Sequence, residues 1–546
     1  MSERLITMEG LEIEGFQEEQ WNKIVHGVDV HLDRGEVIGL IGESGAGKST
    51  IGIAAMGYTR PGCRITGGSI VFDGMDLAQA SDEEKRKLRG VRISYVAQSA
   101  AASFNPAHRL IEQYTETPVQ HGVLPVSEAE KNARAIYRRL ELPDPEHIGE
   151  RYPHQVSGGQ LQRCMVAMAM ACKPDLIVFD EPTTALDVTT QIEVLAAIKD
   201  VIRQFGTASI YITHDLAVVA QVADRIMVLQ YGKTVEVGNA RELLANPKED
   251  YTRRLLSVRK VAEQKVEHPD ADKVILGVNN VSAEYGNGVG VLFNIDLKLT
   301  RSKTVAVVGE SGSGKSTLAR VVTGLLVPTE GDISFDGQPL PPSFKKRSKD
   351  LLRRLQMIYQ MPDVALNPRQ KVRDIIGRAL EFYFGLRGAQ KQARVTELLE
   401  MIELSDRYAD RFPAELSGGE KQRVCIARAL AAEPEMIICD EVTSALDQLV
   451  AEGILKLLQT LQNELHVSYL FITHDLATVK AISDEIVVML QGRVVEFGPR
   501  EEILSPPHHE YTELLLASVP EMDPDWLDGV LERRRTGELI DSVSVN

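Results

Sequence analysis

The chain has 546 residues, a length that excludes a protein of one ordinary domain. Apolar residues make up 43% and charged residues 25%, which is the composition of a globular protein and not of a disordered chain. Its formal charge of −17 argues against indiscriminate binding to nucleic acid. The long uncharged run Ile93–Ala107 contains Ser, Gln, Asn and Pro and is too short to cross a bilayer, so we expect no membrane-spanning helix. Met1–Arg4 lacks the basic and apolar pattern of a signal peptide, which predicts a cytosolic chain.

A set of short motifs occurs twice in the chain, in the same order each time. The first is a glycine-rich run that ends in Gly-Lys-Ser-Thr, at Gly42–Thr50 and again at Gly309–Thr317. A Ser-Gly-Gly triplet, an acidic pair after an apolar run and a Thr-His-Asp triplet follow, with identical spacings between them in both halves. Two copies of one domain explain this order.

The domain boundaries follow from the repeat. We expect a first domain at 1–258, a second at 273–519 and a short C-terminal tail at 520–546. The stretch 259–272 between the two domains is highly charged, lacks apolar periodicity and contains a proline, which is typical of a linker.

Each copy alternates short apolar runs with longer helical patterns, which predicts an α/β domain with a largely parallel sheet. The expected strands are Val37–Ile41, Leu176–Phe179 and Ser209–Thr213 in the first copy, and Val305–Val308, Met436–Cys439 and Tyr469–Thr473 in the second. Polar residues begin where each run stops, and that is where open α/β sheets bind ligands.

The glycine-rich runs fit the phosphate-binding pattern G-x-x-x-x-G-K-[ST], placed between a strand and a helix. One such run is often an ordinary turn, but two in register indicate nucleotide binding. Lys48 and Lys315 are expected to reach the β- and γ-phosphates, and Ser49 and Ser316 to ligate Mg²⁺. The predicted ATP-binding residues here are Gly42, Glu43, Ser44, Gly45, Ala46, Gly47, Lys48, Ser49 and Thr50, then Gly309, Glu310, Ser311, Gly312, Ser313, Gly314, Lys315, Ser316 and Thr317.

Acidic pairs end two of the expected strands, Asp180 with Glu181 and Asp440 with Glu441. Strand-end acids are otherwise ordinary solvated side chains. Beside a phosphate loop, the first carboxylate of each pair suits Mg²⁺ and the second suits polarisation of the attacking water.

Two histidines, His214 and His474, follow apolar strands at the same distance from their acidic pairs. A single histidine in such a place is most often a core or surface residue. Its repetition favours a contact with the γ-phosphate or with the attacking water.

With these motifs the chain resembles the ABC ATPases. Its Ser-Gly-Gly triplets are similar to the family signature, which opens a helix toward the γ-phosphate. The resemblance implies two tandem P-loop NTPase domains, each with a mainly parallel core sheet, a small antiparallel subdomain and a helical subdomain. It also implies two composite sites, in which the signature of one cassette completes the nucleotide site of the other. The expected signature residues are Ser157, Gly158, Gly159 and Gln160, and Ser417, Gly418, Gly419 and Glu420.

The resemblance assigns further residues to the sites. Gln98 and Gln360 are similar to the family glutamines that contact Mg²⁺ or the attacking water, although a solvated loop glutamine is the alternative. Tyr285 is the expected adenine-stacking residue of the second copy. Phe16 is its weaker counterpart in the first copy, with Trp21 competing.

Two other positions extend the resemblance or depart from it. Ala185–Asp187 and Ala445–Asp447 match the D-loop of the family, which crosses the interface between cassettes. Val442 stands where the family usually has proline after the glutamate, and this places the rigidity of that loop in doubt.

Finer details resemble the importer ATPases of the oligopeptide, dipeptide and nickel class. These are Gly-Glu-Ser-Gly in each phosphate loop, Thr66–Ile70 with Phe72–Gly74, and the segments Asn246–Thr252 and Pro506–Thr512. That class usually has two separate ATPase subunits, which are fused here. The resemblance implies an ATPase at the cytoplasmic face of the inner membrane, with two transmembrane permease subunits, a substrate-binding protein, ATP and Mg²⁺.

Other twin-cassette proteins stay open as alternatives. Those that act on ribosomes have a long charged helical linker, and those that act on damaged DNA insert zinc modules; this chain has a short linker and no cysteine cluster. Fused sugar importer ATPases tend to lose catalytic residues in one cassette, whereas both sets are complete here. Peptides, nickel chelates, opines and oligosaccharides all remain candidate substrates.

Overall fold

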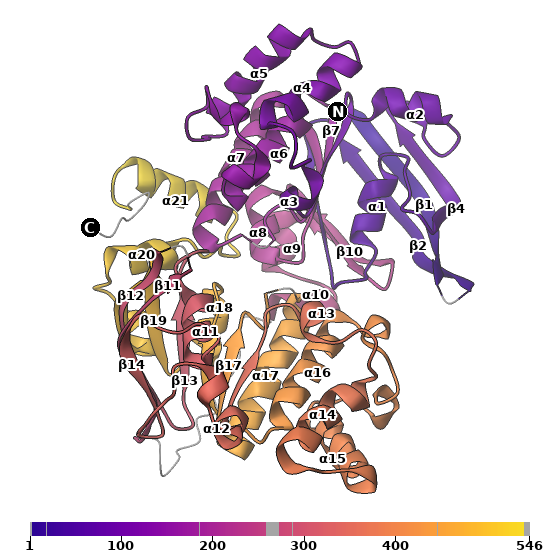
Figure 1. Cartoon of the computed structure of the whole chain (residues 1–546). Helices are drawn as coiled ribbons and strands as arrows, with labels where there is room; N and C mark the ends of the chain where they lie inside the picture. The colour runs from indigo at the N-terminus through magenta and orange to yellow at the C-terminus, as the bar shows by residue number, and fades with distance from the viewer. Residues whose placement is uncertain are drawn as a thin grey trace. The chain divides into compact units, whose positions relative to one another are not determined.

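The computed structural model describes residues 3–17, 19–184, 186–257, 272–286, 288–444 and 446–539 (Figure 1). The chain divides into two compact units. The first is Met1–Ser257 together with Pro520–Glu532, and the second is Val258–Val519 with Arg533–Asn546. The predicted linker 259–272 lies outside the described residues except for residue 272, and so do Ala185 and Ala445 of the predicted D-loops.

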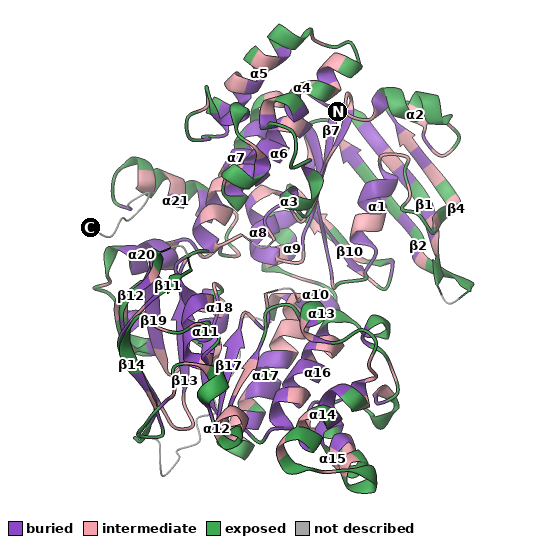
Figure 2. Cartoon of the chain, viewed as in Figure 1, coloured by how far each residue is buried: buried purple, intermediate pink, exposed green. Residues whose placement is uncertain are grey.

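The core of the first unit is a six-stranded sheet. Its order is β10 (Lys233–Asn239), β9 (Arg225–Gln230), β3 (Val37–Ile41), β8 (Ala208–Ile212), β7 (Leu176–Asp180) and β6 (Ile93–Val96). All neighbours are parallel except β9 and β10. Every residue of β3, β7 and β8 is buried (Figure 2), as expected for strands covered on both faces.

A four-stranded antiparallel sheet packs against the same core. Its order is β2 (Gln20–Asp33), β1 (Arg4–Gln17), β4 (Cys63–Phe72) and β5 (Met75–Asp76). Apolar side chains from one face of this sheet, among them Leu11, Ile13 and Ile70, join Ile38 and Leu40 of β3 in one hydrophobic cluster. The two sheets therefore form a single core around the start of α1 (Lys48–Ala54).

The remaining helices of the first unit cover the core sheet and build a helical subdomain. They are α2 (Asp82–Leu88), α3 (Ala100–Ser103), α4 (Leu110–Gln120), α5 (Val126–Arg139), α6 (Gly158–Ala169), α7 (Val188–Phe205), α8 (Leu216–Val222), α9 (Ala240–Ala245), α10 (Asp250–Ser257) and α21 (Trp526–Arg535), of which α21 begins in this unit.

The second unit repeats this architecture. Its core sheet has the order β16 (Leu355–Ile358), β17 (Met436–Asp440), β18 (Ser468–Ile472), β13 (Thr304–Val308), β19 (Glu485–Leu490) and β20 (Arg493–Pro499). Its antiparallel sheet has the order β12 (Val289–Thr300), β11 (Val274–Tyr285), β14 (Glu330–Phe335) and β15 (Gln338–Pro339). Its helices are α11 (Lys315–Thr323), α12 (Lys349–Arg354), α13 (Pro362–Ala365), α14 (Val372–Phe384), α15 (Gly388–Met401), α16 (Gly418–Leu430), α17 (Gln448–Leu465), α18 (Leu476–Ile482), α19 (Arg500–Ile503) and α20 (Glu510–Ala517).

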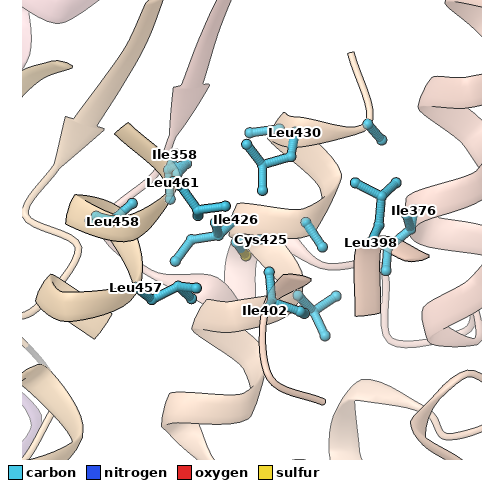
Figure 3. Packing of buried hydrophobic residues seen from close by; sticks show 14 of the residues in the cluster. Ile358, Ile376, Leu398, Ile402, Cys425, Ile426, Leu430, Leu457, Leu458 and Leu461 are labelled. Carbon is cyan, nitrogen blue, oxygen red and sulfur yellow. The ribbon is translucent and has the colours of Figure 1, made fainter. Parts of the chain in front are cut away.

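Helix α16 lies at the centre of the helical part of the second unit. Its Cys425, Ile426 and Leu430 are buried among side chains of α14, α15 and α17 (Figure 3). This packing fixes the direction of α16, and therefore the place of its first residues, Ser417–Glu420.

The predicted α/β class with two mainly parallel core sheets is confirmed. No strand end differs from its expected position by more than one residue. The run predicted as Ser209–Thr213 is Ala208–Ile212, and Tyr469–Thr473 is Ser468–Ile472, so both ends of these two strands lie one residue earlier. The strands end earlier because Thr213 and Thr473 start a turn, in which their Oγ1 atoms accept the backbone N–H groups of the aspartates two residues later. Across the parts of the chain that the structure describes, no helix has the length and apolar character needed to span a bilayer.

The turn between β9 and β10 ties the two sheets of the first unit together at Gly232. Its carbonyl accepts the N–H of His26 in β2 at 2.9 Å, its φ is +71°, and a Cβ there would lie 1.9 Å from the Ile24 carbonyl oxygen. Gly206 also has a positive φ, but nothing lies within 4 Å of its Cβ position.

We predict that Gly232→Ala destabilises the first unit by roughly 2–4 kcal/mol, because it adds a steric clash to the strain of a left-handed alanine. Gly206→Ala should cost only about 1 kcal/mol, from the backbone strain alone. Calorimetric unfolding of the nucleotide-free variants measures both. Equal melting temperatures for the two variants would contradict the assigned contact.

Candidate functional site

Each phosphate loop curls between a core strand and a helix. Gly47 and Gly314 are the N-caps of α1 and α11, with φ of +90° and +104°, a conformation that side chains other than glycine rarely adopt. The loops therefore bring backbone N–H groups to the N-terminus of a helix, which attracts phosphate.

The lysine of each loop lies buried beneath the loop's own backbone. Lys48 Nζ donates hydrogen bonds to the carbonyl oxygens of Gly42 at 2.7 Å and Glu43 at 2.9 Å. The matching contacts of Lys315 Nζ are with the carbonyl oxygens of Gly309 at 2.8 Å and Glu310 at 2.7 Å. Both ammonium groups are thus held where a polyphosphate enclosed by the loop would lie.

The predicted Mg²⁺ ligands come together in both units. Ser49 Oγ donates to Asp180 Oδ1 at 2.7 Å, and Ser316 Oγ donates to Asp440 Oδ1 at 3.0 Å. A hydroxyl beside a carboxylate provides the oxygen donors that Mg²⁺ prefers. Burial raises the pKa of Asp440, and the hydrogen bond from Ser316 only partly offsets this.

Sequence reasoning missed a further contact in the first unit. Tyr95 Oη donates to Asp180 Oδ2 at 2.6 Å, and Arg60 lies 3.7 Å from the same oxygen. Tyr95 in β6 pairs with Val178, whereas the matching position of β16, opposite Ile438, is Met357. The only signal in the sequence was a tyrosine on a strand neighbouring the acidic pair, and many core tyrosines share that property.

The catalytic candidates of the first unit converge on one carboxylate. Gln98 Nε2 donates to Glu181 Oε2 at 3.0 Å, Thr184 Oγ1 donates to the same oxygen at 3.1 Å, and His214 Nδ1 lies 3.3 Å from Glu181 Oε1. Glu181 also has a φ of +50°, which is uncommon for a residue with a side chain. Strain of this kind is typical of functional sites.

The second unit forms the same cluster. Gln360 Nε2 donates to Glu441 Oε2 at 2.5 Å, His474 Nδ1 lies 3.4 Å from Glu441 Oε1, and Glu441 has a φ of +51°. Val442 is buried and its turn is the same as in the first unit: the N–H of Ser444 reaches the Glu441 carbonyl at 3.2 Å, as that of Thr184 reaches Glu181. The missing proline leaves the turn unchanged.

The imidazole and the carboxylate of each cluster stabilise each other's charge. Burial lowers the pKa of His214, but the contact with Glu181 outweighs burial and holds the pKa above its ordinary value of 6.5. Burial raises the pKa of Glu181, but the contacts with His214 and the nearby Lys48 hold it below its ordinary value. His474 and Glu441 show the same directions.

The signature residues open two helices. Ser157 is the N-cap of α6. Its side chain accepts a hydrogen bond from the backbone N–H of Gln160, and the Gln160 side chain accepts one from the backbone N–H of Ser157. Ser417 and Glu420 form the same capping box at the start of α16. A Cβ at Gly159 would lie 2.0 Å from Thr190 Cγ2, so α6 packs closely on α7. The two serines are exposed.

The adenine candidates differ between the units. Tyr285 ends β11 beside α11, where its Oη lies 3.2 Å from Thr317 Oγ1 and accepts from Arg320 at 3.1 Å. The matching register position in β1 is Gly15, where a Cβ would lie 2.5 Å from Ile24 Cδ1.

Phe16 follows one residue later and therefore lies on the other face of the strand. Its ring contacts Trp21, with centroids 5.3 Å apart, and the Arg64 guanidinium lies 3.9 Å from the centre of the Trp21 ring. The first unit has no aromatic residue at the position of Tyr285, so Phe16 is not its structural counterpart.

Comparison with protein-family models gives two matches. The model described as ABC transporter matches residues 25–184 and 292–444, and each match includes a phosphate loop, a signature and an acidic pair. The chain belongs to the ABC transporter family. A second model, described as the oligopeptide/dipeptide transporter C-terminal region, matches residues 495–541. As an ABC ATPase, the chain binds and hydrolyses ATP.

The relatives of this ABC ATPase span nearly its whole length. The glutathione import ATP-binding protein GsiA of Escherichia coli O6:H1 is 36% identical over 565 residues, covering 95% of this chain and 90% of that protein. GsiA of Salmonella typhimurium is 36% identical over 568 residues, covering 96% and 90%. The archaeal ribosome recycling factor aABCE1, solved with the stalk protein aP1, aligns over 88% of each chain with a TM-score of 0.59 and 22% identity, and so shares the fold.

We predict that Lys48→Ala and Lys315→Ala each weaken ATP binding at one cassette and leave the other site intact. Each variant removes a charge-assisted hydrogen bond, which typically contributes about 1.5–3 kcal/mol, or roughly ten- to a hundredfold in affinity. Calorimetric titration of each variant with ATP measures the affinity of each of the two sites. Two unaffected sites in either variant would refute the placement.

The histidine–glutamate pairs predict a pH dependence. Glu181→Gln should lower the pKa of His214, because burial then acts without the opposing carboxylate. Because its folded-state pKa lies above 6.5, His214 contributes stability that is complete below about pH 6.5 and is lost as the pH rises through the folded pKa. Titration by NMR measures the pKa of His214, and the His214→Asn variant assigns its signal.

Glu441→Gln is the control, since it should change the pKa of His474 and leave that of His214 as it is. An unchanged pKa of His214 in Glu181→Gln would argue against the pair.

Proposed function

We propose that this ABC ATPase powers the import of glutathione or other short peptides. The observation that carries the proposal is that a complete set of phosphate loop, acidic pair, glutamine and histidine occurs in both cassettes of a chain that also has the oligopeptide transporter C-terminal region. The relatives named for glutathione import, which match 95% of the chain, support a peptide substrate.

The phosphate-binding groups of the first cassette have separate roles in this proposal. The N–H groups of the phosphate loop and Lys48 bind the β- and γ-phosphates, and Lys48 exchanges its carbonyl partners for phosphate oxygens. Ser49 and Asp180 fit Mg²⁺ because their oxygens are adjacent, with Tyr95 fixing the second carboxylate oxygen. Mg²⁺ would supply positive charge to the phosphate oxygens. In the second cassette Lys315, Ser316 and Asp440 take these roles.

The remaining residues act on the attacking water. Glu181 accepts a hydrogen bond from the water and polarises it, while Gln98 holds one oxygen of that carboxylate in place. His214 would turn from Glu181 toward the γ-phosphate when ATP is bound. Glu441, Gln360 and His474 repeat the arrangement.

We assign the signature residues a role in binding the γ-phosphate. The exposed serines at the first turns of α6 and α16 offer a hydroxyl and helix N–H groups to a γ-phosphate. As in the family, we expect each signature to meet the ATP held by the other cassette. Tyr285 stacks on the adenine of the second cassette; the first must hold its adenine by other contacts, because Gly15 offers no ring.

The proposed partners are two transmembrane permease subunits and, through them, a substrate-binding protein. The chain would bind the permeases at the cytoplasmic face of the inner membrane. Its relation to importer ATP-binding proteins supports this, together with the C-terminal region of the peptide class. The likeness to the ribosome recycling factor is one of fold and does not favour the ribosomal alternative.

We predict that Glu181→Gln and Glu441→Gln each slow ATP hydrolysis sharply while ATP still binds, since the amide keeps the size of the side chain but not the charge that polarises water. If the sites act as a coupled pair, each single variant loses well over half of the turnover, and independent sites would lose about half. Steady-state hydrolysis by the assembled transporter decides this. Wild-type turnover in Glu441→Gln would show that the second site is not catalytic.

A further inference from the structure

The segment Pro520–Glu532 follows the last helix of the second cassette in the sequence, yet it belongs to the compact unit of the first. The chain leaves the second unit at Val519, enters the first unit at Pro520 and returns at Arg533. The sequence predicted only a short tail here. We call this segment the C-terminal clasp.

One buried amide binds the backbone of the clasp. Gln221 in α8 is 2% exposed, and its Nε2 donates to the carbonyl oxygens of Glu521 at 2.7 Å and Asp523 at 3.0 Å. Its Oε1 accepts the N–H of Leu527 at 3.0 Å. Nε2 also donates to the Ala217 carbonyl of its own helix at 3.1 Å, so it is the buried Oε1 that depends on the clasp for its hydrogen bond.

Basic side chains of the first cassette bind the acidic side chains of the clasp. Lys199, itself buried, lies 3.0 Å from Asp528 Oδ1, and Arg203 lies 3.8 Å from Asp528 Oδ2. Arg241 binds Asp525 with both nitrogens, at 2.9 and 2.5 Å. The clasp carries carboxylates at Glu521, Asp523, Asp525, Asp528 and Glu532, and it has no lysine or arginine.

Apolar side chains of the clasp are also buried. Leu527 and Val530, three residues apart on α21, are 0% and 4% exposed. Side chains at this spacing lie on one face of a helix. The clasp therefore has the apolar centre and polar rim of a built interface.

The second cassette lacks the residues that receive the clasp. The positions that match Lys199 and Arg203 of α7 in α17 are Gln459 and Asn463. Those that match Gln221 and Arg241 are Ala481 in α18 and Glu501 in α19. Of two cassettes with the same fold, only the first has the amide and the three cations.

We propose that the clasp is a second tether between the cassettes: the C-terminus of the second cassette is anchored on α7, α8 and α9 of the first, in addition to the covalent connection at 258–272. The anchor is formed by residues of this chain, so we expect it to form without nucleotide and without the permeases. A second link makes the association of the two cassettes intramolecular and so raises the effective concentration of each cassette for the other. We therefore expect the clasp to keep the cassettes associated when ATP is absent.

The test uses the full chain with a protease site inserted between residues 259 and 272. After cleavage in nucleotide-free buffer with EDTA, the two fragments should co-elute in gel filtration. Leu527→Asp, and separately the pair Asp525→Arg with Asp528→Arg, should abolish co-elution. The charge-reversal pair alters two exposed side chains, so we expect both cassettes still to fold.

The two control variants lie outside the clasp. One is further along the C-terminal tail, and the other is in the second cassette, at a helix position that matches a clasp-binding position of the first. Glu538→Arg reverses a charge further along the tail, and Glu501→Ala changes the position that matches Arg241; both should leave co-elution intact. A second readout is Trp526, the only tryptophan left in a Trp21→Phe chain, whose fluorescence anisotropy in the uncut protein should fall in both clasp variants. Separation of the fragments with an intact clasp, or co-elution without one, would overturn the proposal.

Discussion

Two adjacent carboxylates end a core strand beside the phosphate loop of each cassette, and the fold has to hold these like charges together. Asp180 and Glu181 leave the end of β7 with different partners. Asp180 accepts from Ser49 and Tyr95, whereas Glu181 is bound by Gln98 and the imidazole of His214. The left-handed backbone at Glu181 points consecutive side chains to separate groups of donors. The parallel sheet, the buried lysine and the phosphate loop all converge on this point.

The sequence was sufficient for the parts of the site that depend on local geometry. The phosphate loop, the acidic pair and the signature each lie within a few residues, where glycine conformation, a strand end or a helix cap determines the arrangement. Identical spacing in the two halves then predicted a duplicated α/β fold. Gln98 and His214 lie far apart in the sequence. His214 was assigned from its repetition at the same distance from the acidic pair in both halves, and Gln98 only through the resemblance to the family.

The parts that the sequence did not predict depend on contacts between distant segments. Tyr95 reaches Asp180 across neighbouring strands, and nothing in its local pattern separates it from a core tyrosine. Bulges in β1 and β11 shift the pairing, so only the structure shows that Gly15, and not Phe16, matches Tyr285. The clasp was read as a tail because its partners lie some three hundred residues earlier in the chain.

The two cassettes therefore share the same catalytic candidates but differ in several of the residues around them. The first has Tyr95 on Asp180 and a glycine, Gly15, at the register position of Tyr285, whereas the second has Met357 and Tyr285 at these two positions. The clasp residues add a third difference, because the segment Pro520–Glu532 belongs to the compact unit of the first cassette.

We propose that two ATP sites on one chain drive peptide import. Uptake of labelled glutathione into proteoliposomes that contain this chain, its two permeases and the substrate-binding protein, with ATP on the side of the cassettes, tests it directly. We expect uptake that requires ATP and stops when Glu181 and Glu441 are both changed to glutamine. Uptake of neither glutathione nor other short peptides by a transporter that still hydrolyses ATP would contradict it.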